Sequence, residues 1–379
     1  MKLVVFGAGQ LAQMMYLSAV PLGVEVQAVD VKSRNVVHPV TKQELNIKLE
    51  DAFDEATAIT AEFEHVPEDL LQLAETTGKL LPSNVSILTG ADRIREKQLL
   101  EKANVPSVDY VIIDDIKKLH HCIDALGERI ILKATRDGYD GYGQWRVENS
   151  QQLIALEEQF AALDLKSVPI LAEKMVDFNR ELSVIGARKK NGETHVFSLA
   201  ENLHHEGQLH VSTAPAPNLT DDLQSLAEQI FDKIAMTLDY VGVLAVELFH
   251  IDGQLIVNEI APRVHNSGHW TQNGAETSQF EQHVRAVLNL PLGDSQVNKP
   301  TVMLNIIGCT SFKRELISIP GCHLHWYGKS VREKRKMGHI NVTADSFAEL
   351  GEKLEKLTTF LPMDYFPKLQ THIARLRTL

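Results

Sequence analysis

The chain has 379 residues, of which 44% are hydrophobic and 23% are charged, and its formal net charge is −12. This length exceeds a single simple core and predicts two or three domains, while the negative charge argues against nonspecific binding to nucleic acid. No uninterrupted apolar run approaches the roughly 18 residues that a membrane span requires, which excludes a membrane-spanning class.

The N-terminal segment alternates between strand and helix patterns. Lys2–Phe6 is short and apolar, so it predicts a first strand rather than a signal peptide. A helix is predicted over Gln10–Leu22, and further strands over Glu25–Val29 and Ala58–Phe63. This alternation predicts a parallel sheet with helices on its faces, and hence an α/β, Rossmann-like N-terminal domain over residues 1–91.

The middle of the chain has a mixed pattern that predicts a second domain over residues 92–292. A helix over Arg93–Ala103 is followed by a buried strand at Ile130–Lys133, a glycine-rich loop and a return strand at Gln144–Val147. The further elements expected here are a helix over Ser150–Phe160, strands over Ile170–Lys174, Arg180–Arg188 and His195–Ser198, a helix over Asp221–Leu238, and a hairpin of Gly242–His250 with Gln254–Ile260.

The composition changes again after Pro291. Strands are predicted at Thr301–Ile306 and His323–Tyr327, followed by a basic stretch and a closing helix over Phe347–Leu361. This pattern predicts a small C-terminal domain over residues 293–379.

A glycine-rich turn joins the first strand to the first helix. Gly7, Gly9 and Ala12 fit the pattern G-x-G-x-x-A, and Asp30 follows at a suitable distance. In dinucleotide-binding domains such glycines bring backbone amides to a phosphate at the helix N-terminus, and the acid binds a ribose hydroxyl. The pattern also fits a tight turn that faces a different phosphate, or none. The motifs that follow favour this second interpretation over an NAD-dependent oxidoreductase.

A second glycine-rich loop lies between two strands, so it is not of the Walker type. Gly138, Gly141 and Gly143 can make it a flap whose backbone amides close over the phosphates of a nucleotide. Lys133, at the end of the preceding strand, would bring an ammonium group to the same phosphates. The alternative is a hairpin tip without a ligand, for which Tyr139 is an unusual choice.

Two glutamates lie on the two arms of the predicted hairpin, in otherwise apolar strands. Mg²⁺ prefers hard oxygen ligands and usually takes one or two carboxylates together with substrate phosphates. With a two-residue turn, Glu247 would face Asn258, and Glu259 would point to the opposite side of the sheet. Shared metal binding by the two glutamates therefore predicts a longer turn or a β-bulge that places them opposite each other. Two solvated acids are the alternative.

Arg263 and His265 directly follow the hairpin. A metal site built on His265 and His269 is disfavoured because no third soft ligand adjoins them. The pattern instead favours Arg263 as an anion-binding group and His265 as a group that handles a proton. His204 is a weaker candidate for the same pocket.

Five basic residues crowd one stretch of this acidic protein: Lys329, Arg332, Lys334, Arg335 and Lys336. Such a run is often a solvated face. Because it follows a strand with a buried pattern, a phosphate-binding loop is the preferred interpretation, in which only one or two of the five contact the ligand.

The run from Asn258 to Gln272, with its segment Asn266-Ser267-Gly268-His269-Trp270-Thr271, closely resembles the 5-(carboxyamino)imidazole ribonucleotide synthases, the ATP-grasp carboxylases of purine biosynthesis. The likeness covers nearly the whole chain and includes Gly7–Leu11, Thr60–Glu64, Ala91–Leu99, Gly138–Gln144, the hairpin and His323–Ile340. It implies an ATP-grasp fold over residues 92–292, with a flap subdomain at about 107–175. One departure is Ala200-Glu201 before Asn202, where some relatives carry another polar pair.

The resemblance also implies roles for single residues. The residues implied to surround ATP are Arg93, Lys133, Gly138, Tyr139, Asp140, Gly141, Tyr142, Gly143, Gln144, Glu173, Lys174, Met175, Val176, Glu181, His204, Asn258 and Glu259. Those implied to bind the ribonucleotide and bicarbonate are Gly9, Gln10, Leu11, Tyr139, Asp140, Arg263, His265, Lys329 and Arg335. The implied catalytic residues are Lys133, Asp140, Arg263 and His265, and the implied Mg²⁺ ligands are Glu247 and Glu259.

The implied reaction is the ATP-dependent carboxylation of 5-aminoimidazole ribonucleotide by bicarbonate, through carboxyphosphate, with Mg²⁺ as cofactor. Whether Asp140 or His265 moves the proton stays open, and an ATP-grasp ligase that uses formate or an amino acid is the nearest alternative. The expected partners are small molecules, and the family suggests a homodimer. Three widely spaced cysteines, Cys122, Cys309 and Cys322, form no disulfide framework or metal pattern, which fits a cytoplasmic protein.

Overall fold

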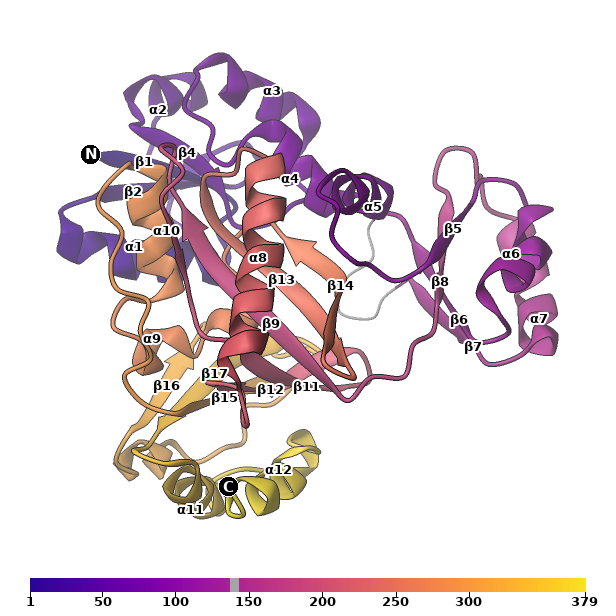
Figure 1. Cartoon of the computed structure of the whole chain (residues 1–379). Coiled ribbons are helices and arrows are strands. Elements are labelled where there is room, and N and C mark those ends of the chain that lie inside the picture. Colours follow the sequence, from indigo (N-terminus) through magenta and orange to yellow (C-terminus); the bar gives the residue numbers. More distant parts are fainter. Residues whose placement is uncertain (137–142) are drawn as a thin grey trace.

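The computed structural model describes residues 1–136 and 143–379, and within these ranges the strands form three sheets (Figure 1). The N-terminal sheet has the order β3-β2-β1-β4, and β1 runs parallel to β2 and to β4. Consecutive residues of β1 are buried, as expected for a parallel strand covered on both faces. The predicted parallel α/β arrangement is thereby confirmed. Its elements are β1 (Lys2–Phe6), α1 (Gln10–Ala19), a 3₁₀ turn (Val20–Leu22), β2 (Glu25–Val29), β3 (Val36–Val37), α2 (Leu49–Glu55), β4 (Ala58–Ala61), α3 (Glu68–Thr76) and α4 (Asn84–Ala91).

Two elements of this unit end earlier than the sequence predicts. The first helix changes to a 3₁₀ turn after Ala19, because Pro21 has no amide with which to continue the α-helical hydrogen bonds. The strand β4 ends at Ala61 rather than at Phe63. Glu62 leaves the strand, and its carboxylate accepts a hydrogen bond from the Ala12 amide at 2.9 Å.

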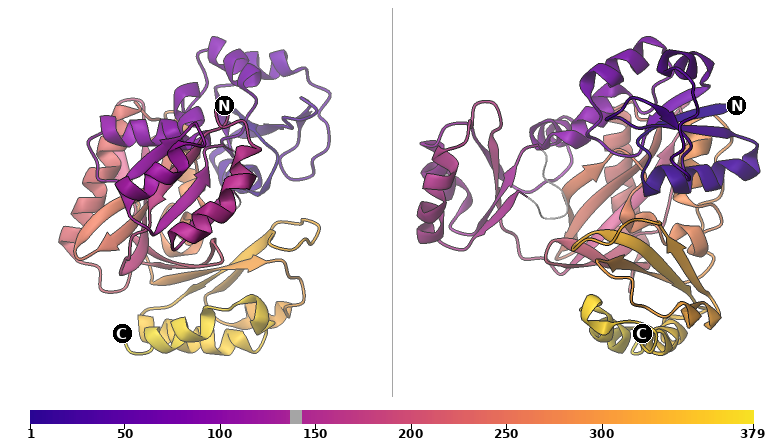
Figure 2. Two further views of the ribbon diagram at one scale, coloured as in Figure 1. Left: turned by 90° about the vertical axis from the view of Figure 1, so that its right-hand side faces the viewer. Right: turned by 180° about the vertical axis from the view of Figure 1, so that it is seen from behind.

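A four-stranded antiparallel sheet projects from the rest of the molecule, as the right view of Figure 2 shows. Its order is β5-β8-β6-β7, and α6 and α7 cover one face through buried side chains such as Leu119, Leu153 and Phe160. We call it the flap sheet, and the strands predicted here are confirmed. Its elements are β5 (Tyr110–Ile113), α6 (Lys118–Leu126), β6 (Ile130–Ala134), β7 (Gln144–Val147), α7 (Ser150–Ala161) and β8 (Ile170–Lys174).

The largest sheet, the main sheet, has nine strands in the order β14-β13-β9-β11-β12-β15-β17-β16, with β10 paired to β9. The helix α8 packs on one face of β9 and β13, where Leu182 and Val246 meet Phe231. The helix α10 packs on the other face, together with Ile185 and Ala245, and also contacts α1. The elements before residue 293 are α5 (Arg93–Lys102), β9 (Arg180–Arg188), β10 (Thr194–Val196), β11 (Ala200–His205), β12 (Gln208–Ala214), α8 (Asp221–Thr237), β13 (Gly242–Ile251), β14 (Gln254–Ala261), a 3₁₀ turn (Asn266–Gly268), α9 (Thr271–Gly274) and α10 (Gln279–Val287).

The main sheet continues into the C-terminal part of the chain. Antiparallel pairing of β12 with β15 joins strands from both sides of residue 293, and α11 and α12 cover this end of the sheet. The sequence did not indicate β11, β12, β17 or α12. The elements here are β15 (Thr301–Ile307), a 3₁₀ turn (Arg314–Ser318), β16 (Cys322–Trp326), β17 (Lys336–Thr343), α11 (Phe347–Thr358), a 3₁₀ turn (Met363–Tyr365) and α12 (Leu369–Leu376). In the described ranges, no helix combines the length and apolarity needed to cross a membrane.

Candidate active site

A cleft of about 1600 Å³ lies where the three sheets meet. The N-terminal turn contributes Gly9 to its walls, the flap sheet Lys133, the main sheet Glu247, and the segment between β16 and β17 Lys329. The cleft therefore gathers most of the residues that the sequence singled out. These are Gly9, Gln10, Leu11, Arg93, Lys133, Gln144, Glu181, His204, Glu247, Asn258, Glu259, Arg263, His265, Lys329 and Arg335.

Two sets of predicted residues are not part of this lining. Gly138, Tyr139, Asp140, Gly141 and Tyr142 of the predicted flap lie outside the described residues. Gly143, Glu173, Lys174, Met175 and Val176 are described but do not line the cleft. Their contacts with ATP stay a prediction.

The hairpin of β13 and β14 carries its two glutamates on one face. From its two-residue turn as far as the pair of Leu248 with Val257, each residue of β13 lies opposite one residue of β14. The following pair is Glu247 with Glu259, so Asn258 is an extra residue that forms a β-bulge. Without the bulge, Glu259 would share the core-facing side of Val257. The bulge that shared metal binding requires is therefore present.

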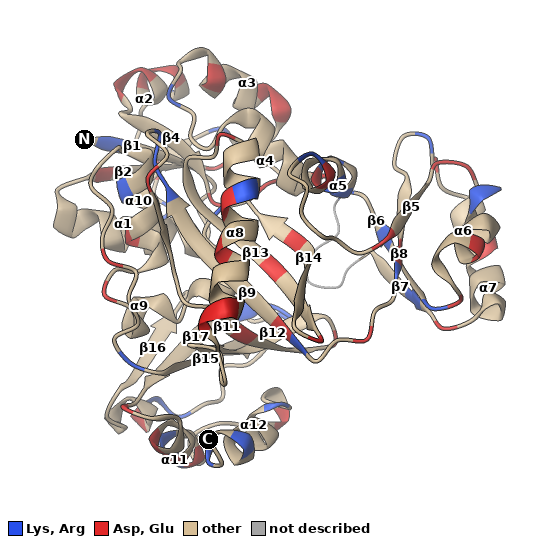
Figure 3. Cartoon of the chain, in the orientation of Figure 1, with Lys and Arg blue, Asp and Glu red and all other residues tan. Residues whose placement is uncertain are grey.

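The charges around this pair differ for its two members. Figure 3 shows acidic positions on β13 and β14 in the middle of the molecule. Burial alone would raise the pKa of Glu259, but Arg93, 3.2 Å away, and Lys133 hold it below its usual value. Burial and the nearby charge of Glu259 raise the pKa of Glu247 to about 7. The repulsion between two such carboxylates is what a divalent cation would relieve.

The donor set at this hairpin suits a hard cation. Glu247, Glu259 and Asn258 offer only oxygen ligands to the cleft, which is the chemistry that Mg²⁺ prefers. Within the described part of the chain, no cluster of three or more His, Cys, Asp or Glu residues could hold a metal by itself. A cation bound here would therefore depend on these groups together with ligand phosphates.

Lys133 is held at the cleft by a buried ion cluster. The carboxylate of Glu173 contacts Lys133 and lies 2.7 Å from Nζ of Lys97. Burial opposes ionisation of Glu173, but the two ammonium groups outweigh it and lower the pKa of this carboxyl to about 2. Because Lys97 belongs to α5, the cluster ties this helix to β6 and β8 of the flap sheet.

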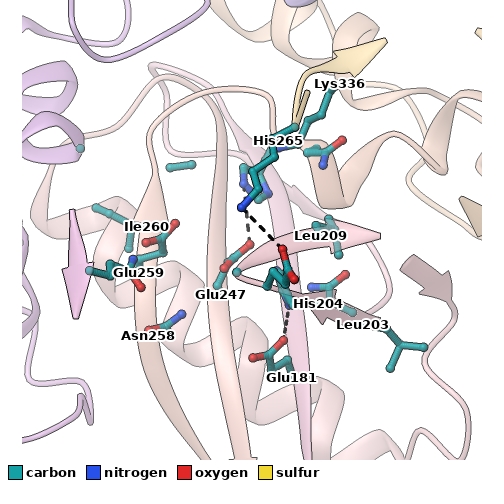
Figure 4. Close-up of a pocket in the computed structure, with 18 of the residues that line it drawn as sticks. Glu181, Leu203, His204, Leu209, Glu247, Asn258, Glu259, Ile260, His265 and Lys336 are labelled. Atoms are coloured by element: carbon teal, nitrogen blue, oxygen red, sulfur yellow. Dashed lines mark hydrogen bonds and ion pairs between the residues drawn. The ribbon is translucent and has the colours of Figure 1, made fainter. Parts of the chain in front are cut away.

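Arg263 and His265 enter the cleft directly after β14. Nε of Arg263 lies 2.7 Å from Oε1 of Glu64. Nε2 of His265 lies 3.7 Å from Oε1 of Glu247, and Figure 4 shows the two side chains pointing toward each other. The Ser267 amide donates to Nδ1 of His265 at 3.3 Å, so the ring proton is on Nε2. Burial and the charge of Arg263 lower the pKa of His265 well below its usual value, so the ring is neutral at pH 7.

His204 and Glu181 form a contact between two neighbouring strands of the main sheet, visible in Figure 4. Burial would lower the pKa of His204, but Glu181 and Glu247 raise it above its usual value. The pair combines a donor with a carboxylate acceptor, which is the combination that sugar hydroxyls need.

The glycine turn is filled by a side chain of the protein itself. The carboxylate of Glu62 accepts hydrogen bonds from the amides of Gly9 and Ala12. Gly7 has φ of +99°, and a Cβ there would lie 2.5 Å from Oε1 of Glu62, so the glycine is required for this approach. Asp30 accepts hydrogen bonds from two amides of its own turn. The amides of the glycine turn and the carboxylate of Asp30 are thus hydrogen-bonded within the protein, where a dinucleotide would need them. This argues against an NAD-dependent oxidoreductase.

The basic stretch forms the connection between β16 and β17. Nζ of Lys329 donates to Oε1 of Gln10 and lies 5.5 Å from the ring centre of Tyr327. Nη1 of Arg335 donates to the carbonyl oxygen of Ser330 at 3.0 Å. The stretch therefore meets the glycine turn across the cleft.

The cleft also holds acidic residues that the sequence did not indicate as site residues, among them Glu62, Glu64 and Glu201. Glu62 and Glu64 follow the carboxyl end of a parallel strand, where ligand sites of α/β sheets collect, and this signal could have identified them. Glu201 is buried and pairs with Arg375 of α12 at 2.8 Å. No local pattern in the C-terminal segment indicates that Arg375 reaches the cleft.

Three family models match successive parts of the chain. They are the ribonucleotide synthetase preATP-grasp domain over residues 1–89, the ATP-grasp domain over residues 98–280, and the phosphoribosylaminoimidazole carboxylase C-terminal domain over residues 301–353. The predicted ATP-grasp fold, with an N-terminal Rossmann-like domain and a small C-terminal domain, is thereby confirmed.

Individual relatives agree with the family models. N5-carboxyaminoimidazole ribonucleotide synthase of Vibrio parahaemolyticus is 48% identical over 371 residues, which are 97% of each chain. The crystal structure of the Thermus thermophilus synthetase is 35% identical, covers 95% of this chain and 98% of its own, and has a TM-score of 0.84. The Aspergillus clavatus synthase, solved with ADP and 5-aminoimidazole ribonucleotide, is 28% identical, covers 99% and 98%, and has a TM-score of 0.83. The chain belongs to the N5-carboxyaminoimidazole ribonucleotide synthase family and is an ATP-dependent ligase of the ATP-grasp type.

Proposed function

We propose that the chain carboxylates the exocyclic amine of 5-aminoimidazole ribonucleotide in purine biosynthesis, with bicarbonate as carboxyl donor and ATP as phosphoryl donor. The observation that carries the proposal is the pairing of Glu247 with Glu259 across a bulge, in a cleft that also holds Lys133, Arg263 and Lys329. Support comes from the Aspergillus clavatus relative, whose structure contains ADP together with 5-aminoimidazole ribonucleotide.

ATP would occupy the part of the cleft between the flap sheet and the main sheet. Lys133 and Arg93 would neutralise its phosphates, and Glu181 with His204 would meet the ribose hydroxyls. The predicted flap at residues 138–144 would close its amides over the phosphates and exclude water from the reactive intermediate.

Glu247 and Glu259 would hold Mg²⁺, which fits their oxygen donors and their mutual repulsion. When bound, the cation supplies charge neutralisation at the transferring phosphoryl group. Arg93 and Lys133 keep Glu259 ionised, so this residue is ready to accept a cation at neutral pH.

Bicarbonate is a poor electrophile because its carbon carries delocalised negative charge. Transfer of the γ-phosphoryl group of ATP to a bicarbonate oxygen gives carboxyphosphate and ADP. Attack of the exocyclic amine on its carbon then releases phosphate, and the amine loses a proton. Arg263 would hold the anion. Because Nδ1 of His265 already accepts from Ser267 and Nε2 carries the proton, Asp140 is the better candidate to take the amine proton.

The ribonucleotide phosphate would bind near the glycine turn, between Gln10 and Lys329. Burial and the nearby charge of Arg335 lower the pKa of Lys329 to about 8. Only the ammonium form binds phosphate well, so KM for the ribonucleotide should be constant below this pKa and rise above it by up to about tenfold per pH unit. Steady-state kinetics between pH 7 and about 9.5 measure this.

The Lys329→Arg variant is the control, because its guanidinium stays charged over this range and KM should lose its pH dependence. Lys329→Ala should raise KM by about ten- to a hundredfold, the effect expected when a charged hydrogen bond is removed. An unchanged KM for Lys329→Ala would return the basic stretch to the interpretation as a solvated face.

The decisive assay is ADP release with and without 5-aminoimidazole ribonucleotide and bicarbonate. The proposal expects release that depends on both. Release that responds to formate or an amino acid instead would support the other ATP-grasp ligases, and release indifferent to every acceptor would overturn the proposal. We further propose a cytoplasmic homodimer, for which light scattering of the purified chain is the test of assembly.

A further inference from the structure

Gln279 lies on α10, directly behind the segment that carries His265. Its side chain is fully buried and is not part of the cleft lining. Oε1 accepts a hydrogen bond from the backbone amide of His265 at 2.9 Å, and Nε2 donates to the carbonyl oxygen of the same residue at 2.7 Å. One side-chain amide therefore holds both backbone polar groups of His265.

The surroundings of Gln279 allow its amide only one orientation. Nε2 also lies 3.0 Å from Nδ1 of His269, so both of its hydrogens have partners and the oxygen must face the His265 amide. The backbone amide of Gln279 donates to Oγ1 of Thr271 at 2.9 Å. A Cβ at Gly268 would lie 2.5 Å from Oε1 of Gln279, so the glycine makes room for this contact.

We propose that Gln279 is a positioning residue, which fixes the backbone at His265 so that Nε2 of that ring faces Glu247 in the cleft. The inference rests on the proposed function, in which His265 belongs to the ribonucleotide and bicarbonate site. The hydrogen bonds from Ser267 then set the rotation of the ring about the fixed backbone. Gln279 itself touches no reactant.

The same network reaches the basic stretch. The ring of His269 lies 4.7 Å from that of His339 on β17, and Nδ1 of His339 is 2.6 Å from the hydroxyl of Tyr327. Tyr327 is separated from Lys329 by a single residue. Gln279 thus contacts both the backbone of His265 and the ring of His269, and His269 leads through His339 and Tyr327 to the start of the basic stretch.

The helix α10 also provides a matched control. Gln282 is fully buried, and its amide accepts from the Gly293 amide at 3.0 Å and donates to the Gly293 carbonyl oxygen at 2.7 Å. It therefore makes the same pair of bonds as Gln279, but to a loop outside the cleft lining. Gln279→Met and Gln282→Met remove equivalent bonds from equally buried sites.

Both variants should lower the thermal unfolding midpoint by similar amounts. Gln279→Met alone should reduce kcat by about a hundredfold with little change in the KM for ATP, because a small displacement of a positioned group is sufficient for such a loss. Hydrogen exchange should accelerate in peptides covering residues 263–269 for Gln279→Met, and in peptides around Gly293 for Gln282→Met. This combination of results supports the inference.

Equal kcat values for the two variants, or unchanged exchange at residues 263–269 in Gln279→Met, would overturn it. A parent protein without substrate-dependent ADP release would refute the proposed function instead, and hydrogen exchange alone would then decide whether Gln279 holds His265. If Gln279→Met does not fold, Gln279→Glu, which keeps the acceptor and loses the donor, takes its place against Gln282→Glu.

Discussion

The Glu259→Gln variant is expected to lose magnesium-dependent ATP cleavage almost entirely. Glutamine keeps the size of the side chain but removes the charge that faces Arg93 at 3.2 Å and stands opposite Glu247. Because charge neutralisation at a transferring phosphoryl group contributes several kcal/mol, kcat should fall by about a thousandfold. ADP release at saturating substrate and Mg²⁺ concentrations measures this loss.

Asp252→Asn is the matched control for that variant. It removes one negative charge from the turn of the same hairpin, and asparagine tolerates the φ of 48° at this position. This control should keep the rate of the parent protein. A Glu259→Gln variant that retained more than about a tenth of the parent rate would refute Glu259 as a metal ligand.

The second large effect is expected from Glu173→Gln, which should destabilise the folded chain by about 3–5 kcal/mol. The substitution leaves the ammonium groups of Lys97 and Lys133 without the carboxylate that now lies between them. Chemical denaturation followed by fluorescence measures the change. The free energy of unfolding of the parent should also fall in acid in a way that the variant does not show. The carboxylate of Glu173 stabilises the fold fully above its pKa in the unfolded chain, near 4.5, and this stabilisation is lost as the pH falls toward its pKa in the folded chain, about 2.

Removing a second charge separates this effect from a loss of packing. In the double variant Lys97→Met/Glu173→Gln, Lys133 is the one charged side chain left of the three in this ion cluster. The double variant should therefore be more stable than Glu173→Gln alone. If it is less stable by the sum of the single effects, uncompensated charge is not the cause of the loss.

The hairpin shows how far chemical reasoning from the sequence can go. The alternation of β13 and β14 with a two-residue turn would place Glu259 on the wrong face for a shared cation. The requirement for sharing therefore predicted either a longer turn or a bulge, and the structure has the bulge, which Asn258 forms. Strands with a strong apolar pattern, such as β6 and β8, were likewise placed almost to the residue. In these cases the information is local, because alternation and turn residues determine it.

Long-range contacts were out of reach of the same reasoning. The side chain that fills the glycine turn is that of Glu62, whose approach depends on where β4 ends beside β1. Arg375 meets Glu201 only because α12 folds back on the main sheet. The role of Gln279 cannot be predicted from the sequence pattern, because a buried glutamine in an amphipathic helix shows its function only through the groups that it contacts.

The unbroken pairing from β14 to β16 has a mechanical consequence. The hairpin of β13 and β14 lies at one edge of this nine-stranded sheet, and the basic stretch connects the two strands at the other edge, so one hydrogen-bonded sheet carries both. The flap sheet is separate from it and is tied to α5 through the ion pair of Glu173 with Lys97. We therefore expect any rearrangement on nucleotide binding to occur mainly in the flap sheet, because no ladder of named strands joins it to the main sheet in the described ranges.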